Sequence, residues 1–125
     1  MSSPVVLYAH HSCDACRKAK RWLAARGVAF SEKSIRETPP GAAELRSMLA
    51  HLGGTRRRLC NTSGADYRAI KLGERLDALS EAEFLALLVA QGNLVKRPFL
   101  LRDTPPLGLV GFDADRWAEA FPPRP

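Results

Sequence analysis

Two cysteines, Cys13 and Cys16, are the residues whose type and spacing point most directly to chemistry in this 125-residue chain. On a helix, this spacing puts the second sulfur about one turn from the first, so that it can attack a disulfide formed there. We expect Cys13 to be the nucleophile and Cys16 to be the resolving thiol.

The elements predicted around this pair place Cys13 at the start of a helix. Val5 to Tyr8 is β-branched and aromatic, as in a strand, and a polar loop ending at Ser12 follows it. Asp14 to Arg26 are good helix formers. Unpaired backbone N–H groups and the positive end of the helix dipole favour a thiolate at such a position, and Arg17 adds positive charge nearby.

A pair of cysteines at this spacing is also half of a zinc site. Zinc would need two further ligands, and the candidates are His10, His11, His51 and Cys60. Adjacent histidines on extended backbone point to opposite sides, so we expect only one of the first two to reach the pair. The sequence favours redox chemistry, and no metal is expected.

Other reactive or aromatic residues are predicted to be structural. Cys60 is interpreted as a small buried hydrophobe, with a third redox thiol as the alternative. His51 is expected at the surface or its boundary, and Trp22 and Trp117 in the core or at its boundary.

Arg97 and Pro98 form a second point of interest. In a redox protein built on a β-α-β unit, an X-Pro bond that opens a later strand can be cis and can present the preceding residue to a thiol substrate. Arg97 would then lie near the Cys13 sulfur and bind an anion or stabilise the thiolate. The alternative is a solvated charge at a strand edge, and Lys96 is expected to face solvent.

The elements that must position these residues begin with a β-α-β unit. The helix after Ser12 ends at Gly27, a residue suited to a left-handed cap, and Val28 to Ile35 resumes an extended pattern. Parallel strands need a helical crossover, so we expect two parallel neighbours with the helix on one face.

The middle of the chain is predicted to be helical. Thr38 is the expected N-cap ahead of Pro39 and Pro40, and apolar residues at helical spacing from Leu45 to Leu52 lead to a stop at Gly53. A short helix is indicated for residues 67–72.

Three further elements complete the prediction. Ser80 and Glu83 form a capping box for a helix that ends at Gly92. Two short strands, 99–102 and 107–110, suit a hairpin. A last helix, capped by Asp113, ends before Pro122.

Composition sets the broad class. The chain is 46% hydrophobic and 26% charged, which is typical of one compact domain with its own core. Three cysteines and the absence of a secretion pattern favour a reducing cytoplasm. The longest nearly apolar run, Phe84 to Val89, is too short to span a bilayer, so no membrane association is expected.

The formal net charge of +6 favours anionic partners. Basic residues are dispersed apart from residues 56–58, and no aromatic-basic pattern accompanies them. Nucleic acid is therefore not expected as a direct partner.

Five ordered blocks of sequence resemble the arsenate reductase/Spx family of thioredoxin-fold proteins. The blocks are Ser12-Cys13-Asp14-Ala15-Cys16-Arg17-Lys18-Ala19, Trp22-Leu23, Asn61-Thr62-Ser63-Gly64, Leu94-Val95-Lys96-Arg97-Pro98 and Val110-Gly111-Phe112. The resemblance implies an α/β, thioredoxin-like fold, with a small mixed sheet, flanking helices and a helical insert at about 38–92. It implies a single domain, 1–125, with a core of about 4–121, and Arg97 before a cis Pro98.

The resemblance also implies two functions. One is a cytoplasmic thiol-disulfide oxidoreductase that acts on a small thiol or an oxidised protein, with glutathione or a dithiol as co-substrate and no other cofactor. Its catalytic residues would be Cys13, Cys16 and Arg97. The residues expected to bind substrate are Ser12, Arg17, Asn61, Arg97 and Pro98.

The alternative is an Spx-like redox regulator that binds the C-terminal domain of the RNA polymerase α subunit. Its switch pair matches Cys13 and Cys16, and residues 54–55 fall where the regulators carry a glycine that meets the polymerase. Where the reductases carry further arginines, this chain has Asn61 and Gly111, which argues against arsenate turnover.

Overall fold

The computed structural model describes residues 2–123, which contain a four-stranded mixed sheet in the order β2-β1-β3-β4. β1 (Val5–Ala9) runs parallel to β2 (Phe30–Ser34) and antiparallel to β3 (Phe99–Arg102), and β3 pairs antiparallel with β4 (Leu107–Val110). The expected α/β fold and terminal hairpin are confirmed. Residues 1, 124 and 125 of the expected single domain lie outside the described residues.

The first helix, α1 (Asp14–Arg26), has both of its predicted ends. It begins after Cys13 and ends at Gly27, whose φ of +77° is the left-handed conformation that favours glycine. β2 is shorter than the predicted extended run. Its start is delayed because the Val28 N–H still donates to the helix carbonyl of Leu23, at 2.9 Å.

A helical segment, residues 42–94, connects β2 to β3. The capping box is confirmed, since Glu83 N–H donates to Ser80 Oγ at 3.1 Å and Ser80 N–H donates to Glu83 Oε1 at 2.9 Å. The elements of this segment are α2 (Ala42–His51), α3 (Arg56–Leu59), α4 (Ala65–Ala69), α5 (Leu72–Arg75), α6 (Glu81–Ala90) and the 3₁₀ helix η1 (Gly92–Leu94).

Two predictions for the middle of the chain are wrong. Thr38 is not an N-cap; its N–H donates to Ser34 O at 2.8 Å in the turn after β2, and Gly41 is the N-cap of α2. Each of two successive prolines disfavours helical backbone in the residue before it, which delays the helix. The expected helix at 67–72 is interrupted, because Lys71 has a φ of +51° between α4 and α5.

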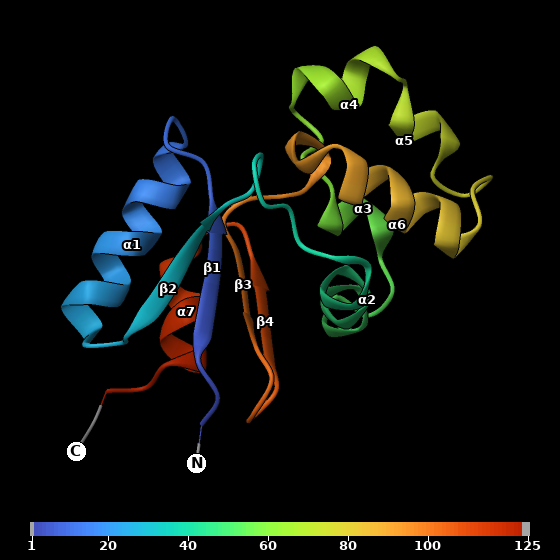
Figure 1. The fold of residues 1–125 in the computed structure, drawn as a ribbon. Coiled ribbons are helices and arrows are strands. Elements are labelled where there is room, and N and C mark those ends of the chain that lie inside the picture. Colours follow the sequence, from blue (N-terminus) through green and yellow to red (C-terminus); the bar gives the residue numbers. More distant parts are fainter. Residues whose placement is uncertain (1, 124–125) are drawn as a thin grey trace.

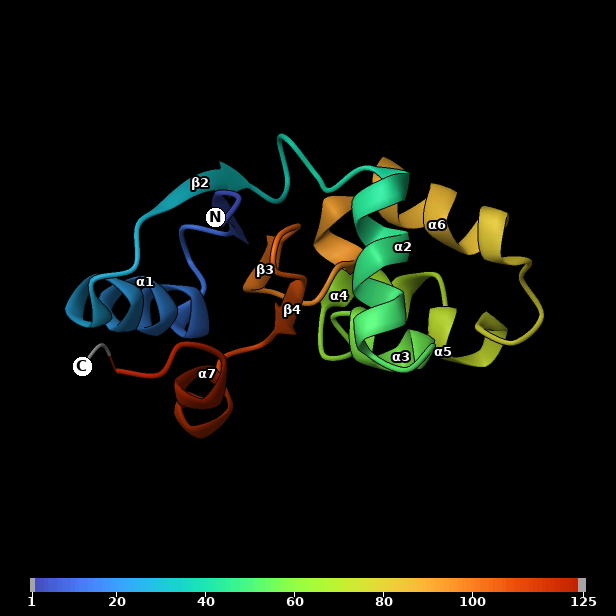
Figure 2. The ribbon, with the colours of Figure 1, turned by 90° about the horizontal axis from the view of Figure 1, so that it is seen from below.

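The sheet has a separate apolar layer on each face (Figures 1 and 2). α1 and α7 (Ala114–Ala120) cover one face, where Leu7, Leu100 and Trp117 are buried. The helical segment covers the other, where Phe84 packs in the same cluster as Phe99. Side chains alternate along a strand, so the same strands serve both layers. None of the helices in residues 2–123 is both long and apolar enough to cross a membrane.

The last helix is capped as predicted. The Asp113 carboxylate accepts the backbone N–H groups of Asp115 and Arg116, at 3.0 and 3.3 Å. α7 follows β4 directly, so this cap also determines how α7 leaves the edge of the sheet.

Candidate functional site

Cys13 occupies the N-cap of α1, at the end of the loop that follows β1. Its backbone is extended, with φ −95° and ψ 116°, and its Sγ accepts the N–H of Cys16 at 3.2 Å. The residue is partly buried. The sulfur therefore lies at the positive end of the helix, where it accepts a first-turn N–H that has no partner within the helix.

Cys16 is a different kind of thiol, because it is 0% exposed and packs in the core with Ala19 and Leu23. Burial raises the pKa of Cys16 to about 12, and the contact with Cys13 adds to the rise. At neutral pH, Cys16 is therefore protonated and shielded, whereas Cys13 is reachable.

Ser12 and Arg17 hold in shape the loop of residues 10–13 between β1 and α1, called the cysteine loop below. The Ser12 N–H donates to His10 Nδ1 at 3.2 Å, and its Oγ lies 2.7 Å from the same nitrogen. Arg17 donates to the carbonyl oxygen of His11 at 3.0 Å and pairs with the carboxylate of Asp14. Ser12 and Arg17, two of the residues predicted to bind substrate, are both exposed beside Cys13. Their side chains contact neighbours within residues 10–14.

The two histidines of the loop do not point to opposite sides, contrary to the expectation. Their rings stack, with centroids 4.5 Å apart, because β1 ends at Ala9 and His10 and His11 lie in the following turn instead of on extended backbone. Among residues 2–123, no three His, Cys, Asp or Glu side chains gather as a metal site would require.

The Arg97–Pro98 peptide bond is cis, as expected. Pro98 is buried, and its carbonyl oxygen accepts the N–H of Gly111 at 2.9 Å. Arg97 Nη1 is buried and has no hydrogen-bond partner within the described part of the chain. Arg97 lies near the cysteine loop, because it lines a pocket together with His10, and its positive charge opposes the burial that raises the pKa of Cys16.

A pocket of about 250 Å³ lies beside the cysteine loop, between it and the helical segment. It is lined by His10, Arg36, Ala65, Asp66, Asn93 and Arg97. Partial desolvation and the charges of Arg97, His11 and Arg36 lower the pKa of His10, which disfavours a further positive charge among these groups.

Arg36 is one of four residues of this pocket that the sequence analysis did not single out, together with Ala65, Asp66 and Asn93. Its Nη1 lies 3.4 Å from His10 Nε2. The signal was present, because β1 and β2 are parallel and the loops after parallel strands meet at the same edge of a sheet. Arg36 comes directly after Ile35 at the end of the predicted second strand.

Asn61 does not line this pocket but contacts a residue that does. Its side-chain amide donates to the carbonyl oxygen of Asn93 at 3.3 Å, and its backbone N–H donates to Leu94 O at 2.8 Å. Asn93 lines the pocket and its amide donates to Asp66. Asn61 thus supports a pocket-lining residue.

Four structural predictions are confirmed. Cys60 is a buried hydrophobe, 1% exposed, and burial raises its pKa to about 12. His51 is exposed, Trp117 is buried and Trp22 is half-buried. Lys96, expected to face solvent, is half-buried.

A family model described as the ArsC family matches residues 8–120. The chain belongs to the ArsC family. Its relatives include the uncharacterized protein YusI of Bacillus subtilis, 39% identical over 92% of this chain and 96% of that one. They also include the global transcriptional regulator Spx of Streptococcus mutans, 31% identical over 96% of this chain and 84% of the regulator.

Solved structures of the family have the same fold. An ArsC family related protein from Bacteroides fragilis superimposes with a TM-score of 0.83, covering 92% of this chain and 95% of that one, at 31% identity. A possible arsenate reductase from Streptococcus mutans gives 0.81, covering 90% and 93%, also at 31% identity. The thioredoxin-like fold of the family is therefore that of this chain.

Proposed function

We propose that this ArsC family member is a thiol-disulfide oxidoreductase in which Cys13 attacks and Cys16 resolves. The observation that carries the proposal is the asymmetry of the two sulfurs. Cys13 Sγ is partly exposed and accepts a first-turn N–H at 3.2 Å, while Cys16 is fully buried one turn further along the same helix.

In the first step, the Cys13 thiolate attacks one sulfur of a substrate disulfide, R–S–S–R′. The S–S bond breaks, a Cys13–SR mixed disulfide forms, and R′S⁻ leaves and takes a proton from water. Cys13 loses its negative charge in this step. Its contribution to the raised pKa of Cys16 is therefore removed, although burial, the larger cause, remains.

In the second step, the Cys16 sulfur attacks Cys13 Sγ. The Cys13–SR bond breaks, the Cys13–Cys16 disulfide forms, and the proton of Cys16 passes to the departing RS⁻. Two electrons have then moved from the protein to the substrate. Two molecules of glutathione, or one dithiol protein, return them and become oxidised to the disulfide.

The basic pocket beside the loop supports a co-substrate that carries an anionic group. Arg97 lines the pocket and has a buried guanidinium nitrogen without a hydrogen-bond partner among residues 2–123, and Arg36 lines the pocket beside it. A carboxylate of glutathione or of a protein substrate would supply an acceptor for the Arg97 guanidinium. A cycle that ends in free thiols fits the reducing cytoplasm, where we place the protein.

A coupled reductase assay with glutathione and hydroxyethyl disulfide tests the proposal. We expect turnover by the wild type and by Cys60→Ala, which removes a buried thiol outside the site, and none by Cys13→Ser. A wild-type rate no higher than background, or a rate that survives in Cys13→Ser, rejects the enzyme.

The second candidate function is a redox-dependent regulator that binds the C-terminal domain of the RNA polymerase α subunit. It is favoured by the likeness to Spx regulators along nearly the whole chain and by the exposed Gly54, which has a φ of +81°. Binding of the isolated α domain that changes with dithiothreitol supports the regulator. Absence of binding in both redox states counts against it.

A further inference from the structure

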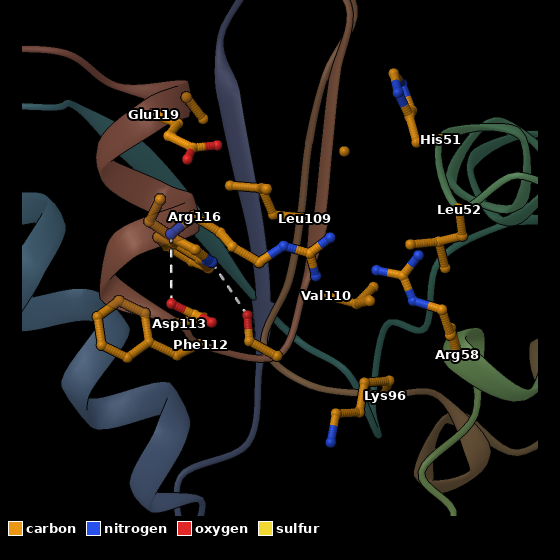
Figure 3. A pocket seen from close by; sticks show the side chains of 14 residues that line it. His51, Leu52, Arg58, Lys96, Leu109, Val110, Phe112, Asp113, Arg116 and Glu119 are labelled. Atoms are coloured by element: carbon orange, nitrogen blue, oxygen red, sulfur yellow. Dashed lines mark hydrogen bonds between the residues drawn. The ribbon is translucent and has the colours of Figure 1, made fainter.

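A groove of about 530 Å³ runs along β4, away from the two cysteines. Figure 3 shows its walls: residues 113–120 of the α7 region lie on one side, and His51, Leu52 and Arg58, from the helical segment, lie on the other. Lys96 lies at its lower end in Figure 3. Gly111 also lines the groove, and its N–H donates to the carbonyl oxygen of the cis proline, Pro98.

Within residues 2–123, the backbone of β4 has no hydrogen-bond partner on the groove side. β4 is the outermost strand of the sheet. In an antiparallel pair, hydrogen-bonded and non-bonded positions alternate, and the bond from Gly111 to Pro98 identifies the bonded set. Leu109 therefore pairs with β3, whereas the N–H and C=O groups of Gly108 and Val110 point to the open edge.

Three basic side chains converge on this edge. Arg58 and Arg116 reach toward each other above Val110 from opposite walls, and Lys96 lies below them (Figure 3). Among residues 2–123, none of the three forms an ion pair with a carboxylate. The nearby carboxylate of Asp113 is occupied by the first turn of α7.

We propose that this groove binds an extended acidic segment of a partner protein. The segment would lie alongside β4, pair its backbone with Gly108 and Val110, and place carboxylates on Arg58, Lys96 and Arg116. An exposed strand edge is a template for a further strand, with backbone bonds giving affinity and side-chain contacts giving specificity.

A peptide fits the groove better than a nucleic acid does. The open edge offers alternating N–H donors and C=O acceptors, which complement a peptide backbone. Leu109 and Val110 are half-buried apolar side chains that suit the apolar residues of such a segment. Trp117, which lines the groove, is 1% exposed, and the half-buried Phe112 packs against it with ring centroids 5.1 Å apart, so neither ring gives a platform for stacked bases.

Fluorescence anisotropy with the full chain tests the charge requirement. The probe is a labelled peptide in which glutamate alternates with valine, and its control has lysine in place of glutamate. We expect only the first to bind, and the double variant Arg58→Glu/Arg116→Glu to weaken it by roughly tenfold or more. Arg57→Glu/Arg21→Glu, with the same change in net charge at exposed positions outside the groove, should change affinity less than about twofold.

Equal losses in the two double variants would mean diffuse attraction by net charge and overturn the proposal. Absence of peptide binding overturns the proposal too. So does tighter binding of a single-stranded oligonucleotide than of the acidic peptide, if Arg58→Glu/Arg116→Glu abolishes the binding of the oligonucleotide. Cys13→Ser should bind the peptide as the wild type does, since neither Cys13 nor Cys16 lines the groove, so this test is independent of the redox proposal.

Amide hydrogen exchange measured by NMR tests the strand pairing. In the complex, the Gly108 and Val110 amides should gain protection, while that of Leu109, already bonded to β3, should change little. No gain at the first two amides means that the peptide does not pair with β4, and it contradicts the proposed mode of binding.

Discussion

At the scale of single residues, the two sulfurs of the pair differ through their environment alone. Cys13 and Cys16 share a helix, yet one accepts an N–H at the surface and the other is enclosed by Ala19 and Leu23. In the proposed cycle, accessibility decides which sulfur meets a substrate first, and burial keeps the second sulfur protonated until it attacks.

This asymmetry predicts where an adduct forms. Under mild oxidant with glutathione, Cys16→Ser should accumulate a mixed disulfide at Cys13, because the resolving thiol is absent. Cys13→Ser should accumulate little. Mass spectrometry of peptide digests locates the adduct, and an adduct mainly at Cys16 would reverse the two roles.

Arg97 should contribute to co-substrate binding. A charge-assisted hydrogen bond from its Nη1, which has no partner among residues 2–123, is worth about 1.5–3 kcal/mol, so Arg97→Gln should raise the KM for glutathione roughly 10- to 150-fold. Arg21→Gln, an exposed change on α1, is the control. Steady-state kinetics with varied glutathione gives both values, and an unchanged KM in Arg97→Gln contradicts this role.

Cys60 should make the protein less stable at alkaline pH. Burial raises its pKa to about 12 from 9.0, so between these values the unfolded state has lost a proton that the folded state keeps. The contribution of the protonated Cys60 thiol to the free energy of unfolding is therefore complete below pH 9. It is lost as the pH rises toward 12, by on the order of 1 kcal/mol per pH unit.

Urea unfolding of the wild type and Cys60→Ala at about pH 8 and about pH 10 measures this effect. The free energy of unfolding should fall less with pH in the variant. Part of the fall should remain in it, because the pKa of Cys16 is also raised to about 12, chiefly by burial. Equal falls in the two proteins would exclude Cys60 as a cause.

At the scale of elements, the cysteine loop and the basic pocket depend on how η1 crosses the end of β2. Gly92 is buried at this crossing, and a β-carbon built there would lie 1.8 Å from the carbonyl oxygen of Ile35. Backbone cannot yield as a flexible side chain can, so this contact helps to hold Arg36, the next residue, at the pocket.

Gly92→Ala should therefore destabilise the protein by about 3 kcal/mol or more, as overpacking against backbone does. Gly41→Ala is the matched control, because its β-carbon would come no closer than 3.4 Å to any atom and the neighbour is the Glu44 side chain. Thermal unfolding should show a large loss for the first variant and a small one for the second. Similar losses would mean that the crossing is not tight.

At the scale of the whole molecule, the sheet joins the two apolar layers into one structure. Tyr8 and Phe99 contribute to the layer under the helical segment, while Leu7 and Leu100, their neighbours along the same strands, contribute to the opposite layer. The helical segment and the cysteine-bearing half should then unfold together, as a single domain does.

Phe84→Ala tests this coupling. It removes a fully buried ring from the helical segment and should cost about 3–5 kcal/mol. Trp22 and Trp117, both in the opposite layer, report on the other half of the molecule. Their fluorescence should show the same shift in midpoint as circular dichroism does. A shift in circular dichroism with unchanged tryptophan fluorescence would indicate two independent units.

The sequence by itself determined the features that neighbouring residues encode. The helix start at Cys13, its end at Gly27 and the capping box at Ser80 all follow from short-range backbone preferences, which act wherever the residues occur. The context of Pro98 in the chain allows a cis bond before it, and the family resemblance implies one, as the structure has it.

Only the tertiary structure decided which distant residues share a site. Asp66 and Asn93 reach the pocket of His10 because the helical segment packs beside the cysteine loop, and Arg58 meets Arg116 because two helices flank the same edge strand. The stacked rings of the cysteine loop likewise depend on where β1 ends. These contacts arise from packing between segments far apart in the chain, and local periodicity carries no information about that packing.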